Sequence, residues 1–171
     1  MRTSRQPVRT LDRLDRRILT VLQADGRISM KDLAEAVGLT ITPCIERVKR
    51  LERDGVIMGY YARLNPALLG SALLVFVEIS LGNKSGNMFE QFRREVLRIP
   101  EVLECHLVSG DFDYLIKARI REIGEYRRLL GDILLQLPGA AQSKSYVVME
   151  EIKETLAIAV DPRESDASAT S

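Results

Sequence analysis

The spacing of apolar residues changes at Asn65-Pro66, and this change constrains the fold more than any other feature of the chain. Before it, apolar residues recur every three or four positions, as in amphipathic helices. After it, runs with a period of two alternate with helical runs. The residue before a proline disfavours helix, so a domain boundary is expected there. The 171-residue sequence predicts a basic flexible arm at 1–10, domains at 11–64 and 65–155, and a disordered polar tail at 156–171.

Three short helices are predicted in the first domain, each with its own boundary signals. Asp12 opens the first helix, which ends in a turn at Asp25. Ser29 is an N-cap for the second helix, Gly38 stops it, and Thr40 can cap the third. The expected apolar face of the third helix consists of Ile41, Ile45, Val48 and Leu51. A glycine-containing turn between the second and third helices is typical of a helix-turn-helix.

The third helix would be the recognition helix of such a motif, because it carries polar and basic residues opposite its apolar face. The candidate DNA-binding residues are Thr40, Thr42, Pro43, Glu46, Arg47, Lys49 and Arg50. Thr42 and Glu46 are the candidates for contacts to base edges, because the N-terminal residues of this helix enter the major groove. Arg47, Lys49 and Arg50 are expected to neutralise phosphates. The other interpretation is a three-helix packing module whose basic face is only solvated.

Charge is distributed unevenly between the two domains, although the net charge is only +1. Residues 1–64 hold 13 Lys and Arg against 8 Asp and Glu, a balance of +5. Residues 65–171 hold 12 against 16, a balance of −4. This asymmetry favours a polyanion as the partner of the first domain. The following β-prone residues 56–64 predict either a short wing or an extended connector.

The second domain shows the order β-α-β-β-α-β. The expected strands are 73–81, 102–108, 114–120 and 143–152, and the expected helices are 88–99 and 123–137. This order is the ferredoxin-like split motif, a four-stranded antiparallel sheet with two helices on one face. The fold class is therefore α+β, with an N-terminal helix-turn-helix domain, winged or nearly so, and a C-terminal ferredoxin-like domain.

The sheet face without helices is expected to be too apolar for water and to pack against a second copy, giving a homodimer. Its residues should include some of Leu74, Phe76, Leu107, Ile116, Val147 and Met149. A dimer also suits a helix-turn-helix protein that reads two half-sites.

Several long motifs in the right order resemble the feast/famine (Lrp/AsnC) regulators. They are LDRLDRRIL at 11–19, DGRIS at 25–29, TPCIERVKRLER at 42–53, ECHLVSGDFDYL at 104–115, LLG at 129–131 and YVVMEE at 146–151. The resemblance runs from about residue 11 to residue 153. Several long motifs in order are far more specific than one short motif.

This resemblance implies a transcriptional regulator that binds double-stranded DNA, forms dimers that assemble toward octamers, and binds an amino acid such as leucine between dimers. The effector residues that it implies are Leu107, Gly110, Asp111, Asp113 and Tyr114, with Val147 and Val148 as possible apolar lining. Chemically, Gly110 lets backbone amides approach a carboxylate, and Asp111 or Asp113 could receive an ammonium group. Without the resemblance, the same loop reads as an ordinary β-hairpin turn.

The architecture is compatible with two other functions. Some haem-pathway decarboxylases share it, and a stand-alone amino-acid sensor or assembly module would use the helical domain to recruit protein instead of DNA. Against an enzyme, the only histidine, His106, stands beside Cys105, which is too sparse for a zinc site, and no catalytic triad or phosphate-binding loop is found. No cofactor or metal is expected. The basic excess in residues 1–64 speaks against the sensor without DNA.

The sequence is expected to be cytoplasmic. It shows no secretory signal and no apolar run of roughly 18 residues that could span a membrane. Cys44 and Cys105 are the only cysteines and lie far apart, which fits a reducing compartment better than a disulfide scaffold. Cys44, on the predicted recognition helix, is either an oxidation-sensitive thiol or, more commonly for such a position, an inert small residue.

Overall fold

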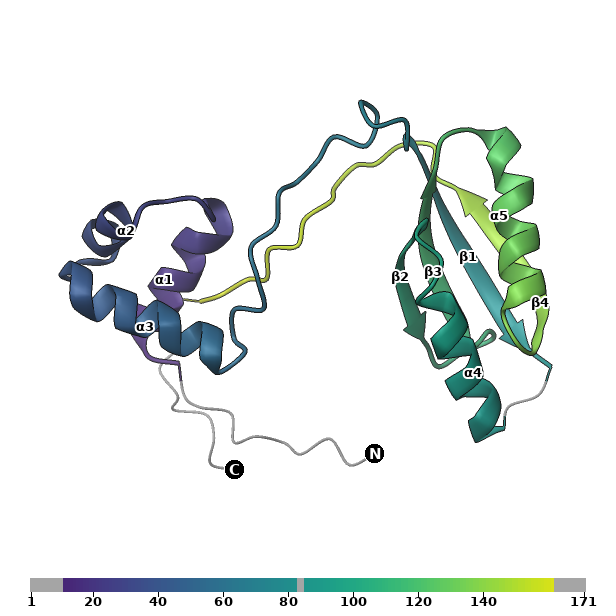
Figure 1. The fold of residues 1–171 in the computed structure, drawn as a ribbon. Coiled ribbons are helices and arrows are strands. Elements are labelled where there is room, and N and C mark those ends of the chain that lie inside the picture. The colour runs from purple at the N-terminus through teal and green to yellow at the C-terminus, as the bar shows by residue number, and fades with distance from the viewer. Residues whose placement is uncertain (1–10, 83–84, 162–171) are drawn as a thin grey trace. The chain divides into compact units, whose positions relative to one another are not determined.

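The computed structural model describes residues 11–82 and 85–161, and the chain divides into two compact units (Figure 1). The first, here the helical unit, comprises Met1–Arg63 and Thr155–Ser171; the second, the sheet unit, is Leu64–Glu154. The division thus falls one residue before the expected boundary between residues 64 and 65. The arm at 1–10 and the end of the tail lie outside the described residues. Residues 155–161, which include the first six residues of the tail expected at 156–171, are described and belong to the helical unit.

The three expected helices are present as α1 (Arg13–Ala24), α2 (Met30–Val37) and α3 (Ile41–Arg53). Asp12 caps α1 in a full capping box, in which its carboxylate accepts the Asp15 N–H at 2.8 Å and Asp15 accepts the Asp12 N–H at 3.3 Å. Ser29 caps α2 by accepting the Asp32 N–H, and Gly38 ends α2 with a φ of 74°. Thr40 stands at the N-cap of α3, but its side chain makes no capping bond.

The buried stripe of α3 differs from the expected one. Cys44, Val48 and Leu51 are buried, whereas Ile41 is 47% exposed. The prediction that Ile41 belongs to the core was wrong. The helix is turned so that the small Cys44 side chain packs among α1 and α2 residues, and Ile41, in the first turn, lies short of that contact. Burial raises the pKa of the Cys44 thiol, so this cysteine is an inert packing residue and not a reactive thiol.

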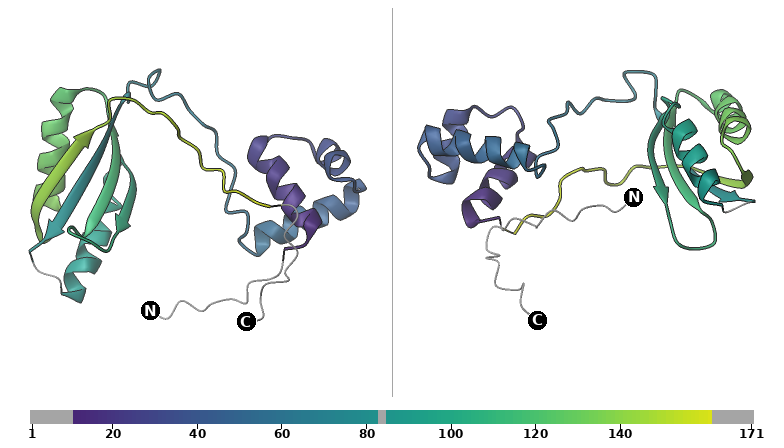
Figure 2. Two further views of the ribbon diagram at one scale, coloured as in Figure 1. Left: turned by 180° about the vertical axis from the view of Figure 1, so that it is seen from behind. Right: turned by 60° about the horizontal axis from the view of Figure 1, so that its bottom comes forward.

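The stretch between α3 and β1 is described throughout and contains no strand, so residues 56–64 form an extended connector instead of a wing (Figure 2). The Tyr60 hydroxyl donates to Glu52 of α3 at 3.0 Å. Burial, followed by this hydrogen bond, raises the pKa of Tyr60 to about 12. The phenol therefore stays protonated and keeps the connector attached to α3.

The C-terminal segment, residues 155–161, is also part of the helical unit. The Gln23 amide of α1 donates to the Ile158 carbonyl at 2.9 Å, and its oxygen accepts the Ile158 N–H at 2.7 Å. Val160 packs against the core of the three helices. These contacts add a piece of chain from the far end of the sequence to the helix-turn-helix.

The sheet unit has the predicted order β-α-β-β-α-β. Its elements are β1 (Leu73–Leu81), α4 (Gly86–Val96), β2 (Val102–Leu107), β3 (Tyr114–Ile120), α5 (Ile123–Gln136) and β4 (Ala140–Val147). The strand order is β2-β3-β1-β4 with every neighbouring pair antiparallel, as the ferredoxin-like motif requires. Compared with the prediction of 143–152, β4 begins three residues earlier and ends five earlier. It starts directly after a turn at Gly139, which has a φ of 77°, and pairs with β1 only as far as Val147.

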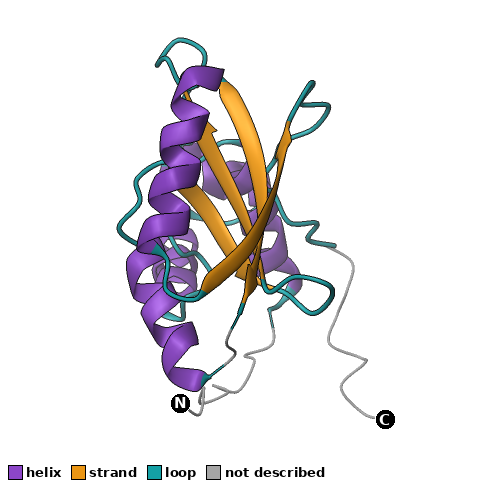
Figure 3. Cartoon of the chain, turned by 90° about the vertical axis from the view of Figure 1, so that its right-hand side faces the viewer, coloured by secondary structure: helices purple, strands orange, loops and turns teal. Residues whose placement is uncertain are grey.

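Both helices pack on one face of the sheet (Figure 3), where the core includes Val75, Val77, Ile116 and Phe92. Ile116 is fully buried on this face, so its assignment to the open face was wrong. Leu107 and Val147 pair in register with the buried Tyr114 and Val75, which places them on the helix side as well. Met149 lies beyond the end of β4. The prediction assigned Leu107, Ile116 and Val147 to the wrong face, because a shift of one residue in a strand's alternation moves a side chain to the other face of the sheet.

The open face carries Leu74 and Phe76, as expected, but it is also strongly charged. Lys117 donates to Glu104 at 3.1 Å and to Glu154 at 3.0 Å. Arg119 makes two bonds to Glu151, at 3.0 and 2.6 Å. The open face is therefore not simply apolar, contrary to the prediction from the sequence. Glu151 and Glu154, which follow β4, place their carboxylates against the cationic side chains of β3.

Candidate nucleic-acid interface and effector loop

The outward face of α3 brings most of the candidate DNA-binding residues to the surface of the helical unit. The exposed ones are Thr40, Thr42, Pro43, Glu46 and Lys49. Helical spacing puts Thr42, Glu46 and Lys49 on one side of the helix, away from the buried stripe. The N-terminal half of this face is polar and neutral to acidic, and the C-terminal half is basic.

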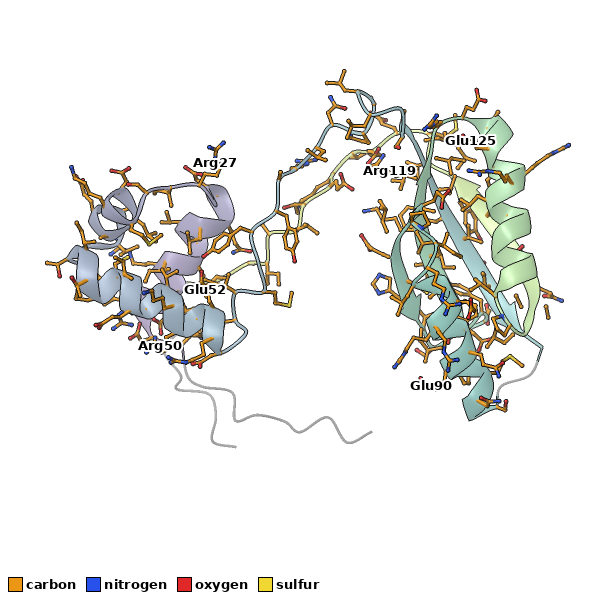
Figure 4. The ribbon with its side chains drawn as sticks, in the orientation of Figure 1. Arg27, Arg50, Glu52, Glu90, Arg119 and Glu125 are labelled. Carbon is orange, nitrogen blue, oxygen red and sulfur yellow. The ribbon has the colours of Figure 1, made fainter. Side chains whose placement is uncertain are left out.

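Arg47 and Arg50 are half-buried and bind two carboxylates of α1 (Figure 4, where Arg50 is labelled). The Arg47 Nη1 donates to Asp12 at 2.6 Å and to Asp15 at 2.8 Å. The Arg50 Nη2 donates to both oxygens of Asp15, each at 2.5 Å. The bond to Asp12, with that to Asp15, raises the pKa of the Arg47 guanidinium. Although partial burial acts the other way, the Asp15 N–H and Arg47 together lower the pKa of the Asp12 carboxyl.

A surface hollow of about 410 Å³ lies over the same arginines. Its lining consists of Pro43, Glu46, Arg47, Arg50 and Arg53. Arg53 was not among the predicted DNA-binding residues. Its spacing of three residues from Arg50 on the same helix was the signal that would have included it. Three guanidinium groups along one hollow make a surface suited to an anion.

The loop between β2 and β3 exposes three of the candidate effector residues close together in sequence. Leu107 is 61% exposed, Asp111 is exposed, and Gly110 has a φ of 149°, a conformation that favours glycine. An apolar side chain at the end of β2, an exposed carboxylate and an accessible backbone are thus placed within five residues.

Asp113 and Tyr114 have interior positions instead. The Asp113 carboxylate is 7% exposed and accepts the Leu81 N–H at 2.8 Å, while its own N–H donates to Ile79 at 2.9 Å. Tyr114 is stacked on Phe92 with ring centroids 3.8 Å apart. Of the two aspartates proposed as the ammonium acceptor, Asp111 is the accessible one, and Asp113 fastens the loop to the end of β1.

Val147 and Val148 do not join this loop within one chain. Val147 lies on the edge strand β4 and pairs with Val75 of β1. Leu107 lies on the other edge strand, β2, and pairs with Tyr114 of β3. Val75 and Tyr114 lie near opposite ends of the β1–β3 ladder. The seven candidate effector residues therefore form two separate groups in one protomer.

Within residues 11–82 and 85–161, no group of three or more His, Cys, Asp or Glu side chains is placed to hold a metal ion. His106 pairs with Glu104 at 3.2 Å, and Cys105 is half-buried with its pKa raised to about 11 by burial. None of the helices in the described part of the chain is long and apolar enough to cross a membrane.

Two family models match the chain. The Lrp/AsnC ligand binding domain matches residues 74–158, and a winged helix-turn-helix DNA-binding model matches residues 11–58. One match covers the three helices of the helical unit, and the other covers the strands and helices of the sheet unit from Leu74 on.

Similar proteins match over nearly the full length. The leucine-responsive regulatory protein of Escherichia coli K12 is 52% identical over 161 residues, covering 94% of this chain and 98% of that relative. Its Serratia marcescens counterpart is 53% identical over 159 residues, covering 93% and 97%. Among solved structures, a Neisseria meningitidis transcriptional regulator in complex with L-Met has a TM-score of 0.84 at 35% identity, covering 89% and 98%. An AsnC family regulator from Agrobacterium tumefaciens has the same TM-score and identity, covering 90% and 99%.

Proposed function

The chain belongs to the Lrp/AsnC family, as a DNA-binding transcriptional regulator that responds to an amino acid and is not an enzyme, and from this premise we propose which residues perform each task. The exposed face of α3 is the DNA-reading surface. Thr42 and Glu46 meet base edges in the major groove, Thr40 and Pro43 lie at the helix entry, and Arg47, Lys49 and Arg50 meet phosphates. The observation that carries this assignment is the exposure of that face.

The β2–β3 loop is the effector site in this proposal. Asp111 receives the α-ammonium group, the backbone at Gly110 meets the α-carboxylate, and Leu107 contacts an apolar side chain. We place leucine first among the effectors, because the E. coli and Serratia relatives are named leucine-responsive. Methionine is the second candidate, because the Neisseria neighbour was solved with L-Met.

The separation of Leu107 from Val147 supports a site shared between copies of the chain. Val147 is 37% exposed and can line an effector bound at Leu107 only when a second copy supplies it. We therefore propose a homodimer that assembles further, toward an octamer, in the cytoplasm. An amino acid that bridges copies would favour one assembly over another, with a coupling of about 1–3 kcal/mol to DNA binding.

Lys49→Ala is the sharpest test of the DNA surface. Lys49 is exposed on α3, whereas Arg47 and Arg50 also hold α1, so their loss would mix folding with binding. The variant should weaken binding to all duplexes and reduce the slope of log affinity against log salt by about one phosphate contact. Lys153→Ala, an exposed lysine of the sheet unit, is the control. Equal affinity and slope in the Lys49 and Lys153 variants would remove Lys49 from the phosphate contacts.

A gel-shift titration on the DNA upstream of the chain's own gene tests the effector. It is run alone and with leucine, methionine and a panel of other amino acids. A shift in affinity with leucine supports the proposal, and a shift with another amino acid alone replaces leucine. An affinity that ignores every amino acid would overturn the effector assignment and leave the DNA surface standing.

A further inference from the structure

Arg47 and Arg50 are bound to the same buried carboxylate, that of Asp15 on α1. The Asp15 side chain is 2% exposed, and its two oxygens accept from Arg47, from Arg50 and from the Asp12 N–H. A carboxylate offers about four acceptor positions, and these bonds use all of them. A buried carboxylate that is fully occupied in this way holds its partners in one geometry.

The two guanidinium groups are only partly used by these bonds. Each donates to the α1 carboxylates through one terminal nitrogen, Nη1 in Arg47 and Nη2 in Arg50. The side chains remain 25% and 37% exposed and line the hollow of about 410 Å³ on the outward face of α3. A guanidinium has five N–H donors in a rigid plane, so fixing one nitrogen sets the direction of the others.

Asp15 and Asp12 also cancel the charge of the two arginines. Two carboxylates and two guanidinium groups are in direct contact, so the cluster is neutral as a whole. Attraction of DNA over long distances therefore gains little from Arg47 and Arg50. What the cluster provides is orientation, since a side chain that is already ordered loses less freedom when a phosphate binds.

We propose that Asp15 is a positioning residue for DNA recognition, which holds the guanidinium groups of Arg47 and Arg50 in the direction that a backbone phosphate in the hollow requires. This inference rests on the proposed use of α3 as the DNA-reading surface. It assigns a function in binding to a buried acidic residue that touches no DNA itself. The phosphate contacts then set the register of α3 on the duplex, and through it the base contacts.

Asp15→Asn tests the proposal, because it removes the charge and keeps the shape. Binding is measured on a duplex selected from random sequences by the unsubstituted chain, and on a scrambled duplex of equal length and composition. The ratio of the two affinities should fall by about tenfold, the worth of one charge-assisted hydrogen bond. Affinity for the scrambled duplex should hold or rise, since the domain gains one positive charge.

Asp32→Asn is the matched control. Asp32 occupies the third position of α2, as Asp15 does in α1, and bonds only its own cap, Ser29. The Asp32→Asn variant makes the same change of charge in the helical unit. Its ratio of affinities for the selected and scrambled duplexes should equal that of the unsubstituted chain. Asp15→Glu keeps the charge and suits a capping box, so it should restore the ratio to within about threefold.

Two results with Asp15→Asn would overturn the proposal. The first is an unchanged ratio of affinities in a folded variant. The second is an equal fall in both affinities together with a lower Tm, because that result would show that Asp15 acts in folding alone. If Asp15→Asn does not fold, Arg50→Lys tests the same geometry, because it keeps the charge beside Asp15 but has no planar guanidinium to orient, and an unchanged ratio there overturns the proposal too. A chain that selects no sequence at all would instead contradict the DNA surface on α3.

Discussion

Asp15 and Asp113 are the two buried charged residues in the described part of the chain, and each fastens a functional segment to the core. Asp15 holds two arginines of the recognition helix, and Asp113 holds the effector loop through the Leu81 N–H. A buried carboxylate is costly unless its acceptor positions are filled. The Asp15 carboxylate accepts from two guanidinium groups and the Asp12 N–H, and the Asp113 carboxylate accepts from the backbone N–H of Leu81.

Asp113→Ala should destabilise the sheet unit and abolish the amino-acid response, while DNA binding without effector persists. The substitution leaves the buried Leu81 N–H without its acceptor, which costs about 1–3 kcal/mol. Asp111→Ala, at an exposed position, should abolish the response with a change in stability within about 0.5 kcal/mol. Thermal unfolding and gel shifts with the effector measure both. A normal response in the Asp111 variant would exclude that residue as the ammonium partner.

The lowered pKa of Asp12 predicts how the helical unit responds to acid. A carboxyl whose pKa is lower in the folded than in the unfolded chain stabilises the fold above its usual value of 3.8, and this contribution disappears as the pH falls through the folded-state pKa. Stability should therefore be steady near neutral pH and decline below about pH 4. In Asp12→Asn, Tm measured from pH 7 to pH 2.5 should decline less. An identical decline in both proteins would show that Asp12 does not contribute.

At the scale of elements, the helical unit is completed by chain from both ends of the sequence. The C-terminal segment (155–161) bonds to α1 through both polar atoms of the Gln23 amide and contributes Val160 to the core. The helix-turn-helix pattern of residues 11–58 is thus not the whole of its folded unit.

Ending the chain at Glu154 should loosen the helical unit, whereas ending it at Asp161 should not. Loss of two hydrogen bonds and of Val160 should cost roughly 1–3 kcal/mol and lower Tm by several degrees. Hydrogen exchange of the α1 amides is the local measurement, since it reports the opening of that helix. Equal exchange in both truncated chains would mean that the segment does not support α1.

At the scale of the whole molecule, the open sheet face combines apolar residues with ion pairs. Phe76 lies between Lys117 and Tyr146 in register, and the Tyr146 hydroxyl donates to Glu78 at 2.9 Å. Such a surface suits an interface whose apolar contacts drive association and whose charges fix its orientation.

Phe76→Glu should convert the proposed dimer to monomer, because it replaces an apolar contact in the middle of that face with a charge that the interface would have to desolvate. Leu97→Glu, at a position that is 80% exposed at the end of α4, should leave the assembly intact. Sedimentation velocity measures both. An unchanged mass for the Phe76 variant would move the interface to another surface.

The sequence alone was sufficient for the elements whose signals are local. Alternation placed β1 and β3 at their observed bounds, and caps at Ser29 and Gly38 bounded α2, because such signals act over a few residues. Tertiary structure alone decided that Cys44 instead of Ile41 completes the buried side of α3, that Asp15 binds Arg47 and Arg50, and that Val147 lies apart from Leu107. Each of these outcomes depends on packing between elements distant in sequence, as with Asp15 and Arg50, 35 positions apart, and no local periodicity specifies such a contact.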